Sequence, residues 1–376
     1  MSFDKKYNTG LGEPLDDAIA RFDEFLSDGA TEFIAGLWDS QAGGFYYSNS
    51  AKEYKGFTPD AKSTLQVLNL LSSGAIQGVK GHLPEKLPCD IKDKLLSFAD
   101  TSESRGKTIK EKLGALPESA GSAKPAAKSA PPKKYETKEQ LIAFLDETFA
   151  SSDASVKLKA EIANIKSSSM LDTMFDYLDG AAFLKLEGYA SAAEVYKIGS
   201  IYNDEKRKIA KASEILEYVL VLIASDDAPD SVTDIYNAWA ALRILLQNAE
   251  NYGESDKALA YSCVRSVADI IVNKTLEKLL AFKKSDGGYS YYQAATPGVV
   301  SGKRVSLGIA EGDINSTVTV LHGVRGNVFS CLGLTTPPLF PAITFTALVD
   351  MMYSAKPIKK RRIPLKYLKM QKRRPV

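Results

Sequence analysis

The chain has 376 residues, of which 44% are hydrophobic and 25% are charged, and its formal net charge is +2. This composition is typical of a globular protein with one large or two smaller domains, and it excludes a collagen-like or largely disordered chain. Residues 356–376 contain ten Lys or Arg and no acid, which leaves the remaining chain with 38 basic and 46 acidic residues, a net charge of −8. A net negative body argues against nucleic-acid binding outside this basic segment.

Several absences narrow the class of protein further. The first residues lack the apolar core of a secretory signal, and no run approaches the roughly 20 apolar residues of a membrane span. Cys89, Cys263 and Cys331 are far apart and odd in number, so neither a disulfide framework nor a zinc ribbon is indicated. We therefore expect a soluble, cytoplasmic protein.

Apolar residues recur mostly at helical spacing, which predicts an all-α protein. The clearest stripe consists of Ile215, Leu216, Val219, Leu222 and Ile223. In chain order, the predicted helices cover residues 16–26, 63–71, 91–99, 138–149, 156–165, 171–184, 191–198, 215–223, 239–246 with a cap at 230–231, 256–282 and 343–352. The best strand candidates are the short aromatic stretches at 45–47 and 289–292, whose pattern suits small hairpins.

Two segments stand apart in composition. Residues 116–135 are rich in Ala, Pro, Ser and Lys and lack apolar periodicity, which predicts a disordered loop or linker. Residues 356–376 are expected to form a flexible basic tail, because prolines and dense like charge oppose a packed helix. The chain is thus divided into residues 1–115, the linker, residues 136–355 and the tail.

One phrase occurs twice. "GGFYY" begins at Gly43 and is followed by "DAKSTLQVL" from Asp60, while "GGYSYY" begins at Gly287 and is followed by "DINSTVTVL" from Asp313. The two aspartates suit helix caps, because a carboxylate accepts bonds from the N–H groups that a helix start leaves unpaired. The glycines permit backbone angles that other residues disfavour. Each unit therefore predicts a Gly-Gly turn, an aromatic arm, a polar connection and a new helix.

The phrase resembles the repeat of the α/α-toroid proteins of the terpenoid cyclase and protein prenyltransferase superfamily. There, a "GGF" or "GGW" turn precedes a helix that starts with D-x-x-S/T. The matching residues here are Gly43, Gly44, Phe45, Asp60, Ser63, Thr64, Gly287, Gly288, Tyr289, Asp313, Ser316 and Thr317. The resemblance implies an (α/α) toroid, a double ring of helices around a central cavity, joined by short aromatic, hairpin-like connections. "IYNAWAAL" from Ile235 is then the start of a further inner helix.

The catalytic motifs of that superfamily do not accompany the repeat. The D-x-D-D motif of class II cyclases and the Asp, Cys and His zinc ligands of the prenyltransferases have no match in this sequence. "DDAPD", with Asp226, Asp227 and Asp230, spells the D-D-x-x-D that class I terpene synthases use to hold magnesium. Because Pro229 interrupts it, the alternative of an acidic turn between helices is preferred, and no metal or cofactor is predicted.

A second constellation suggests a lyase. Asn315 and His322 are seven residues apart and share a helix face, with Arg325 following and Tyr289 and Tyr291 upstream. In a polysaccharide lyase, Asn or Arg neutralises a uronate carboxylate while Tyr or His moves the proton, and several such lyases are α/α toroids. These five residues are the predicted catalytic set. The alternative is a half-buried histidine among packing tyrosines.

Aromatic side chains of the two arms suggest a ligand mouth. The predicted ligand contacts are Trp38, Tyr46, Tyr47, Asp60, Tyr292 and Asp313. Tyrosine and tryptophan there suit stacking on sugar rings or burial of isoprenoid chains. Packing between helices is the alternative role for each of them.

Three functions are compatible with these patterns. The first is a toroid that binds an elongated apolar or sugar-like ligand in an aromatic-lined cavity. The second is a polysaccharide lyase acting on uronate-containing glycans. The third is a non-enzymatic interaction protein whose basic tail, including "IKKRR", contacts an anionic surface such as lipid or nucleic acid.

Overall fold

The computed structural model describes residues 7–72, 83–102, 105–115, 137–148, 153–164, 170–181, 186–337, 342–355, 357–364 and 367. The predicted linker at 116–135 lies outside these residues, as does the end of the predicted tail. Throughout the described part the chain is mostly helical, as the periodicity predicts. Within it, no helix is both long enough and apolar enough to cross a membrane.

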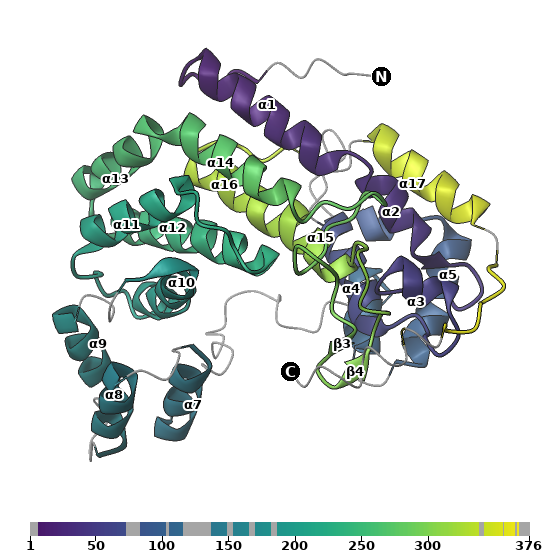
Figure 1. Cartoon of the computed structure of the whole chain (residues 1–376), viewed down its shortest axis with the longest axis horizontal. Coiled ribbons are helices and arrows are strands. Elements are labelled where there is room, and N and C mark those ends of the chain that lie inside the picture. The colour runs from purple at the N-terminus through teal and green to yellow at the C-terminus, as the bar shows by residue number, and fades with distance from the viewer. Residues whose placement is uncertain are drawn as a thin grey trace.

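A first group of elements forms an N-terminal lobe (Figure 1). It consists of α2 (Ala30–Gly36), β1 (Trp38–Asp39), β2 (Gly44–Phe45), α3 (Asn49–Glu53), α4 (Ala61–Ser72), η1 (Leu83–Lys86), α5 (Cys89–Asp100), α6 (Gly106–Lys112) and α17 (Ala342–Ser354). Strands β1 and β2 pair antiparallel, with Trp38 opposite Phe45. Helix α17 packs on α2, so residues 342–354 and 30–36 meet in this lobe.

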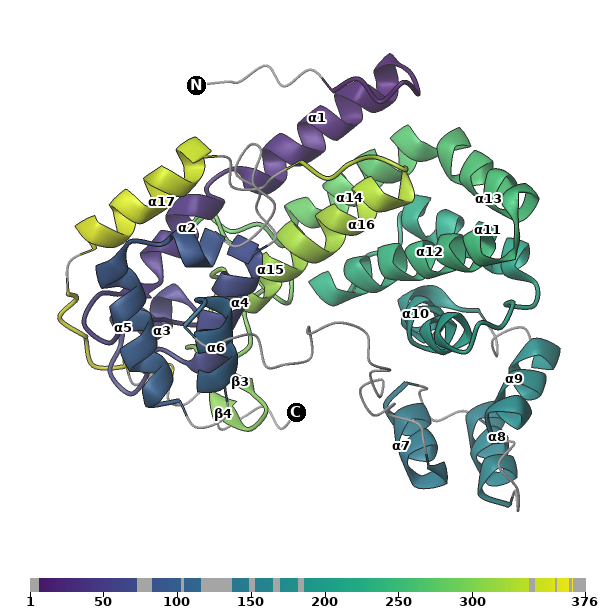
Figure 2. The same ribbon diagram turned by 180° about the vertical axis from the view of Figure 1, so that it is seen from behind.

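A second group forms a helical lobe, and three further helices lie at its edge (Figures 1 and 2). The helical lobe contains α10 (Gly188–Asp204), α11 (Ala212–Ala224), α12 (Val232–Tyr252), α13 (Glu254–Ser266) and α14 (Ala268–Leu280). At the edge lie α7 (Lys138–Thr148), α8 (Asp153–Asn164) and α9 (Met170–Ala181). The long helix expected over residues 256–282 is two helices that break at Val267.

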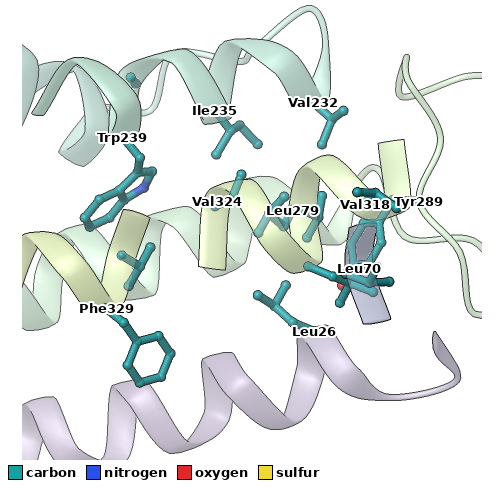
Figure 3. Close-up of a cluster of buried hydrophobic side chains, with 14 of the residues drawn as sticks. Leu26, Leu70, Val232, Ile235, Trp239, Leu279, Tyr289, Val318, Val324 and Phe329 are labelled. Atoms are coloured by element: carbon teal, nitrogen blue, oxygen red, sulfur yellow. The ribbon is translucent and has the colours of Figure 1, made fainter. Parts of the chain in front are cut away.

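A helical rod joins the lobes. It is built from α15 (Ile314–Val318), the π-helix η2 (Thr319–Val324) and α16 (Arg325–Cys331), and α1 (Glu13–Ser27) lies across it. Its α15 end packs on α4, and its η2 and α16 parts pack on α12. Figure 3 shows the shared core, in which Trp239 of α12 and Phe329 of α16 lie in one buried cluster. Both side chains are almost fully buried, so the rod is the central element of the molecule.

The two Gly-Gly segments, residues 43–47 and 287–292, have the same local structure. Asp60 N donates to Phe45 O at 3.2 Å, and Asp313 N donates to Tyr289 O at 2.8 Å. In turn, Phe45 N and Tyr289 N each donate to a threonine hydroxyl one turn into the following helix, both at 3.0 Å. The repeated sequence therefore forms a repeated set of hydrogen bonds.

Helix caps complete this equivalence. Ser63 N donates to Asp60 Oδ1 at 2.9 Å, and Ser316 N donates to Asp313 Oδ1 at 2.8 Å. The second carboxylate oxygen of each aspartate accepts the hydroxyl of the same serine. Each cap thus satisfies N–H and O–H groups of a first helical turn, which fixes where α4 and α15 begin.

The segments also link neighbouring helices in a fixed order. Ile314 N donates to Tyr47 O, and Val232 N donates to Tyr291 O, both at 3.0 Å. The first Gly-Gly segment therefore bonds the starts of α4 and α15, and the second bonds the starts of α15 and α12. The resulting spatial order is α12, α15, α4, which places the last unit of the chain beside the first.

Hairpin β3 (Val299–Val300) and β4 (Lys303–Arg304) lies between the second Gly-Gly segment and α15. The periodicity did not predict it. All three cysteines are free, and Cys331 is buried while Cys89 and Cys263 are exposed.

Candidate functional site

The predicted aromatic ligand contacts are mostly internal. Trp38 and Tyr46 are 1% and 3% exposed; Trp38 packs on Phe45, and the Tyr46 hydroxyl donates to Asp39 at 2.8 Å. Tyr47 is also buried, with its hydroxyl bonded to Thr296 and Asp313. These side chains are held by protein groups, which is the packing role that the sequence left open.

The predicted acidic contacts act as caps. Asp60 begins α4, and Asp313, which is completely buried, begins α15 while also accepting the Thr296 hydroxyl at 2.5 Å. Tyr292 differs from the rest because half of it is exposed and its ring meets Tyr291 edge-on at 4.7 Å. Ligand binding by this set stays a prediction. In the structure most of these side chains are buried and bonded to other protein groups.

The predicted catalytic set is divided between two places. Tyr289 is fully buried beneath the Lys283 ammonium, and its hydroxyl has no hydrogen-bond partner among the described residues. Asn315 lies in the first turn of α15. His322 and Arg325, by contrast, line one cavity of about 410 Å³ beside the π-helix.

That cavity lies between α12, the rod and the segment after α16. Its described lining is formed by Tyr236, Arg243, Leu321, His322, Gly323, Arg325, Gly326, Asn327, Ser330, Thr336 and Pro337. A volume of this size is in the range of small-molecule sites. We call it the π-helix cavity.

The described lining of the π-helix cavity includes basic side chains but no acidic ones. Arg243, His322 and Arg325 contribute cationic or titratable nitrogen, and none of the described lining residues is Asp or Glu. Lys112 of α6 adds a further positive charge near His322. Because Arg325 is paired with Asp23 and the neutral form of His322 is favoured, Arg243 supplies the net positive charge of the described lining.

The two arginines have different roles. Arg325 is 3% exposed, its Nε donates to Asp23 Oδ1 at 2.5 Å, and its Nη1 donates to Pro337 O at 2.9 Å. The partner Asp23 is equally buried and also accepts the Tyr7 hydroxyl. Arg325 therefore fastens α1 to the rod from inside the cavity wall.

Arg243 is available to a ligand. Its side chain is exposed, its Nη1 contacts Asn327 Oδ1 at 3.4 Å, and no ion pair among the described residues involves it. An arginine that is not neutralised by a carboxylate and is directed by an amide has donors left for a bound anion. Arg243 is thus the cation that the cavity offers.

The pKa values of His322 and Tyr236 are shifted in opposite directions. His322 is exposed, and partial desolvation, together with the smaller effect of the positive charge on Lys112, lowers the pKa of its imidazole, which favours the neutral form. Desolvation and a 3.3 Å contact with the Tyr196 hydroxyl raise the pKa of Tyr236. At neutral pH the cavity therefore contains a proton acceptor and a proton donor.

A π-helix begins between Asn315 and His322. A spacing of seven residues shares a face only in a regular α-helix, whereas the wider turn of a π-helix shifts the phase of the residues after it. The π-helix spans Thr319–Val324, so it covers part of the stretch from Asn315 to His322. His322 lines the cavity, whereas Asn315 is not among its lining residues.

Sequence reasoning missed the polar cavity residues Tyr236, Arg243, Asn327, Ser330 and Thr336. Tyr236 and Arg243 are seven apart on α12, directly in and after the "IYNAWAAL" stretch, so helical spacing was a usable signal for that pair. Nothing local linked them to Asn327, because the pairing with α16 is a tertiary contact.

The acidic turn at Asp226–Asp230 has the structural role that the preferred alternative predicts. Asp226 pairs with Lys274 at 2.9 Å, and Ser231 caps α12 in a capping box with Asp234. Among the described residues, no group of three or more His, Cys, Asp or Glu is arranged to hold a metal ion.

Comparison with models of protein families, with curated proteins and with solved structures found no match for this chain.

Proposed function

We propose that this protein binds a small, negatively charged, sugar-like ligand in the π-helix cavity, and that its helices form part of an α/α toroid. The observation that supports the cavity as a binding site is Arg243, which forms no ion pair among the described residues and lies in a described lining without Asp or Glu. The second half extends the resemblance of the repeated Gly-Gly phrase from sequence to architecture.

The hydrogen bonds of the two Gly-Gly segments support the toroid. Both segments use the same donors and acceptors, and both connect successive helices in the order α12, α15, α4. A repeated connection of this kind adds one helix after another with a constant relation. Because the last unit bonds to the first, the arrangement has the adjacency that a ring requires.

The lining favours a sugar-like ligand over an isoprenoid chain. Asn327, Ser330 and Thr336 supply an amide and two hydroxyls, and Tyr236 supplies a ring. Aliphatic side chains are limited to Leu321 and Pro337 among the described lining, too few to bury a long hydrocarbon. A hydroxylated ring with one carboxylate or phosphate matches this mixture.

Binding to Arg243 gives the test. We expect glucuronate, galacturonate and glucose 6-phosphate to bind, and glucose to bind far more weakly, as measured by calorimetry at low salt. Arg243→Gln should weaken binding of the acidic sugars by about tenfold or more, because a charge-assisted hydrogen bond contributes roughly 1.5–3 kcal/mol.

Arg21→Gln is the matched control. Arg21 is also an exposed arginine that donates to an asparagine, Asn273, at 3.1 Å, but it lies on α1 outside the cavity lining. Its replacement should leave affinity unchanged. Equal affinity for glucose and the acidic sugars, or equal loss in both variants, would contradict the proposal.

A second candidate, a uronate lyase, is favoured by His322 and Tyr236 facing the same cavity. In this reaction Arg243 pairs with the uronate carboxylate and neutral His322 takes the proton from C5. The electron pair forms a C4–C5 double bond, the C4–O bond breaks, and Tyr236 protonates the leaving oxygen. The set differs from the predicted one, since Tyr236, Arg243 and Asn327 replace Tyr289, Tyr291 and Asn315.

Ultraviolet absorbance of the unsaturated uronate distinguishes lyase from binding protein. A lyase increases absorbance when mixed with oligogalacturonide or oligoglucuronide, and His322→Ala removes this increase while it retains binding. Constant absorbance with substrates that bind by calorimetry leaves binding as the function and rejects the lyase.

A further inference from the structure

The stretch "IKKRR" is held against the N-terminal lobe. Arg361 N donates to Glu53 O, and Lys55 N donates to Arg361 O, both at 2.9 Å. These bonds form a parallel bridge between Tyr54 and Arg361. Residues 357–364, expected to be part of a flexible tail, thus include an extended segment bound to the end of α3.

The ammonium group of Lys360 lies between the carbonyls of Ala51 and Phe57 and the ring of Tyr46, a site that we call the ammonium seat. Its Nζ donates to Phe57 O at 2.6 Å and to Ala51 O at 3.4 Å. The same nitrogen lies 4.4 Å from the centre of the Tyr46 ring, within the range of a cation–π contact. Two carbonyl acceptors and an aromatic face match the three donors and positive charge of a lysine.

The neighbouring residue adds a second, weaker contact. The Arg361 guanidinium lies 3.9 Å from the Glu53 carboxylate, with most of the arginine exposed. Lys359 and Arg362, on either side of the pair, are exposed. The segment is therefore bound through one inserted lysine, one surface ion pair and main-chain hydrogen bonds, as in strand addition.

We propose that residues 46–57 form a binding site for an extended Lys-Arg segment of a partner protein, which the chain's own Lys360 and Arg361 occupy in the free state. The recognition groups are the Tyr46 ring, the carbonyls of Ala51 and Phe57, the Glu53 carboxylate, and the main-chain groups at the end of α3 that bond Arg361. They are contributed by residues that lie about 300 positions before the bound segment in the sequence. The covalent connection only raises the effective concentration of the internal occupant.

A labelled peptide tests whether the site accepts a segment in trans. The probe is the free peptide of residues 357–364, measured by fluorescence anisotropy against full-length protein at physiological salt. Lys360→Ala in the protein empties the ammonium seat and should raise affinity for the peptide by about tenfold or more. Wild-type protein, in which the tethered segment competes, should bind it weakly.

Lys359→Ala is the matched control, because it removes one positive charge of the same segment at an exposed position. It should behave as the wild type does. A peptide that itself carries Lys360→Ala should not bind the Lys360→Ala protein. Equal binding of both peptides, or equal behaviour of both protein variants, would overturn the proposal, because attraction between a basic peptide and an acidic body would then explain the result.

Hydrogen exchange checks that the variant is folded and that the segment has left. In Lys360→Ala the amide of Lys55 should exchange faster, since it loses the Arg361 carbonyl, while amides within α4 stay protected. The added peptide should restore protection of Lys55. Unchanged protection of Lys55 in the variant also contradicts the proposed role of Lys360.

Discussion

At the scale of single residues, glycine and aspartate decide where the repeated units turn. Gly43 has a φ of +73°, and a Cβ built on it would lie 2.2 Å from the carbonyl oxygen of Lys94 in α5. Gly287 in the second segment has a φ of +86° and would meet Gly29 O at 2.3 Å. Both positions therefore require glycine for two separate reasons, backbone angle and close approach.

A pair of substitutions separates these reasons. Gly302, in the turn between β3 and β4, has the same φ of +73° and nothing within 4 Å of a built Cβ. Gly302→Ala should cost about 1–2 kcal/mol of unfolding free energy from the backbone angle alone. Gly43→Ala should cost a further 1–3 kcal/mol, roughly, because the Lys94 carbonyl must move.

Urea unfolding of the two variants measures the difference. Equal losses would mean that α5 shifts freely and that the first Gly-Gly turn does not lock it. A larger loss in Gly43→Ala would show that the turn and the helix are packed as one unit.

Local signals of this kind are visible in a sequence. The caps Asp60, Asp313 and Ser231 and the turn at Gly43 could be predicted because each acts within a few residues of its own position. Arg325 could not be assigned in the same way, since its partner Asp23 lies 302 residues away. Sequence proximity instead grouped it with Tyr289, which the structure buries elsewhere.

At the scale of elements, periodicity identified the long helices and failed on the short ones. Helix α1 extends over Glu13–Ser27, around the expected 16–26, because its apolar stripe faces the core over several turns. Helices α2 and α3 have seven and five residues, too few for a period to be counted. Length therefore limits what a stripe can show.

Irregularities inside helices were equally invisible. The break at Val267 contains no Gly or Pro, and the apolar pattern continues across it. The π-helix at Thr319–Val324 likewise has no sequence signal of its own, although it begins between Asn315 and His322, of which only His322 lines the cavity. Tertiary packing sets both features. The sequence alone therefore did not specify which side chains of this helical stretch face the same side.

At the scale of the whole molecule, Glu311 joins the last unit of the chain to the first. It is 6% exposed, and its carboxylate accepts Ser50 N at 2.7 Å, Ser50 Oγ at 2.5 Å and Ser48 Oγ at 3.0 Å, at the start of α3. Nearby, Asp286 of the second Gly-Gly turn accepts Asn49 Nδ2 at 3.0 Å. The N-terminal lobe is thus attached to the C-terminal unit by two acids.

Burial raises the pKa of Glu311 from 4.5 to about 7, opposed by its hydrogen bonds from Ser50 and Ser48 and supported by the charge of Asp286. The folded protein therefore binds a proton more tightly than the unfolded chain does. Its contribution to stability is complete below pH 4.5 and is lost as the pH rises through 7, by up to about 1.4 kcal/mol per pH unit.

Comparing wild type with Glu311→Gln between about pH 4.5 and 7.5 tests this junction. In chemical unfolding, the free energy of unfolding of the wild type should fall as the pH rises, and that of Glu311→Gln should fall less. The half-buried Glu194 on α10 also has its pKa raised to about 7, but it adds the same slope to both proteins and cancels in the difference. Parallel pH profiles would mean that Glu311 is ionised throughout this range. The three donors at the start of α3 would then outweigh the desolvation of this carboxylate at the interface between the first and last units.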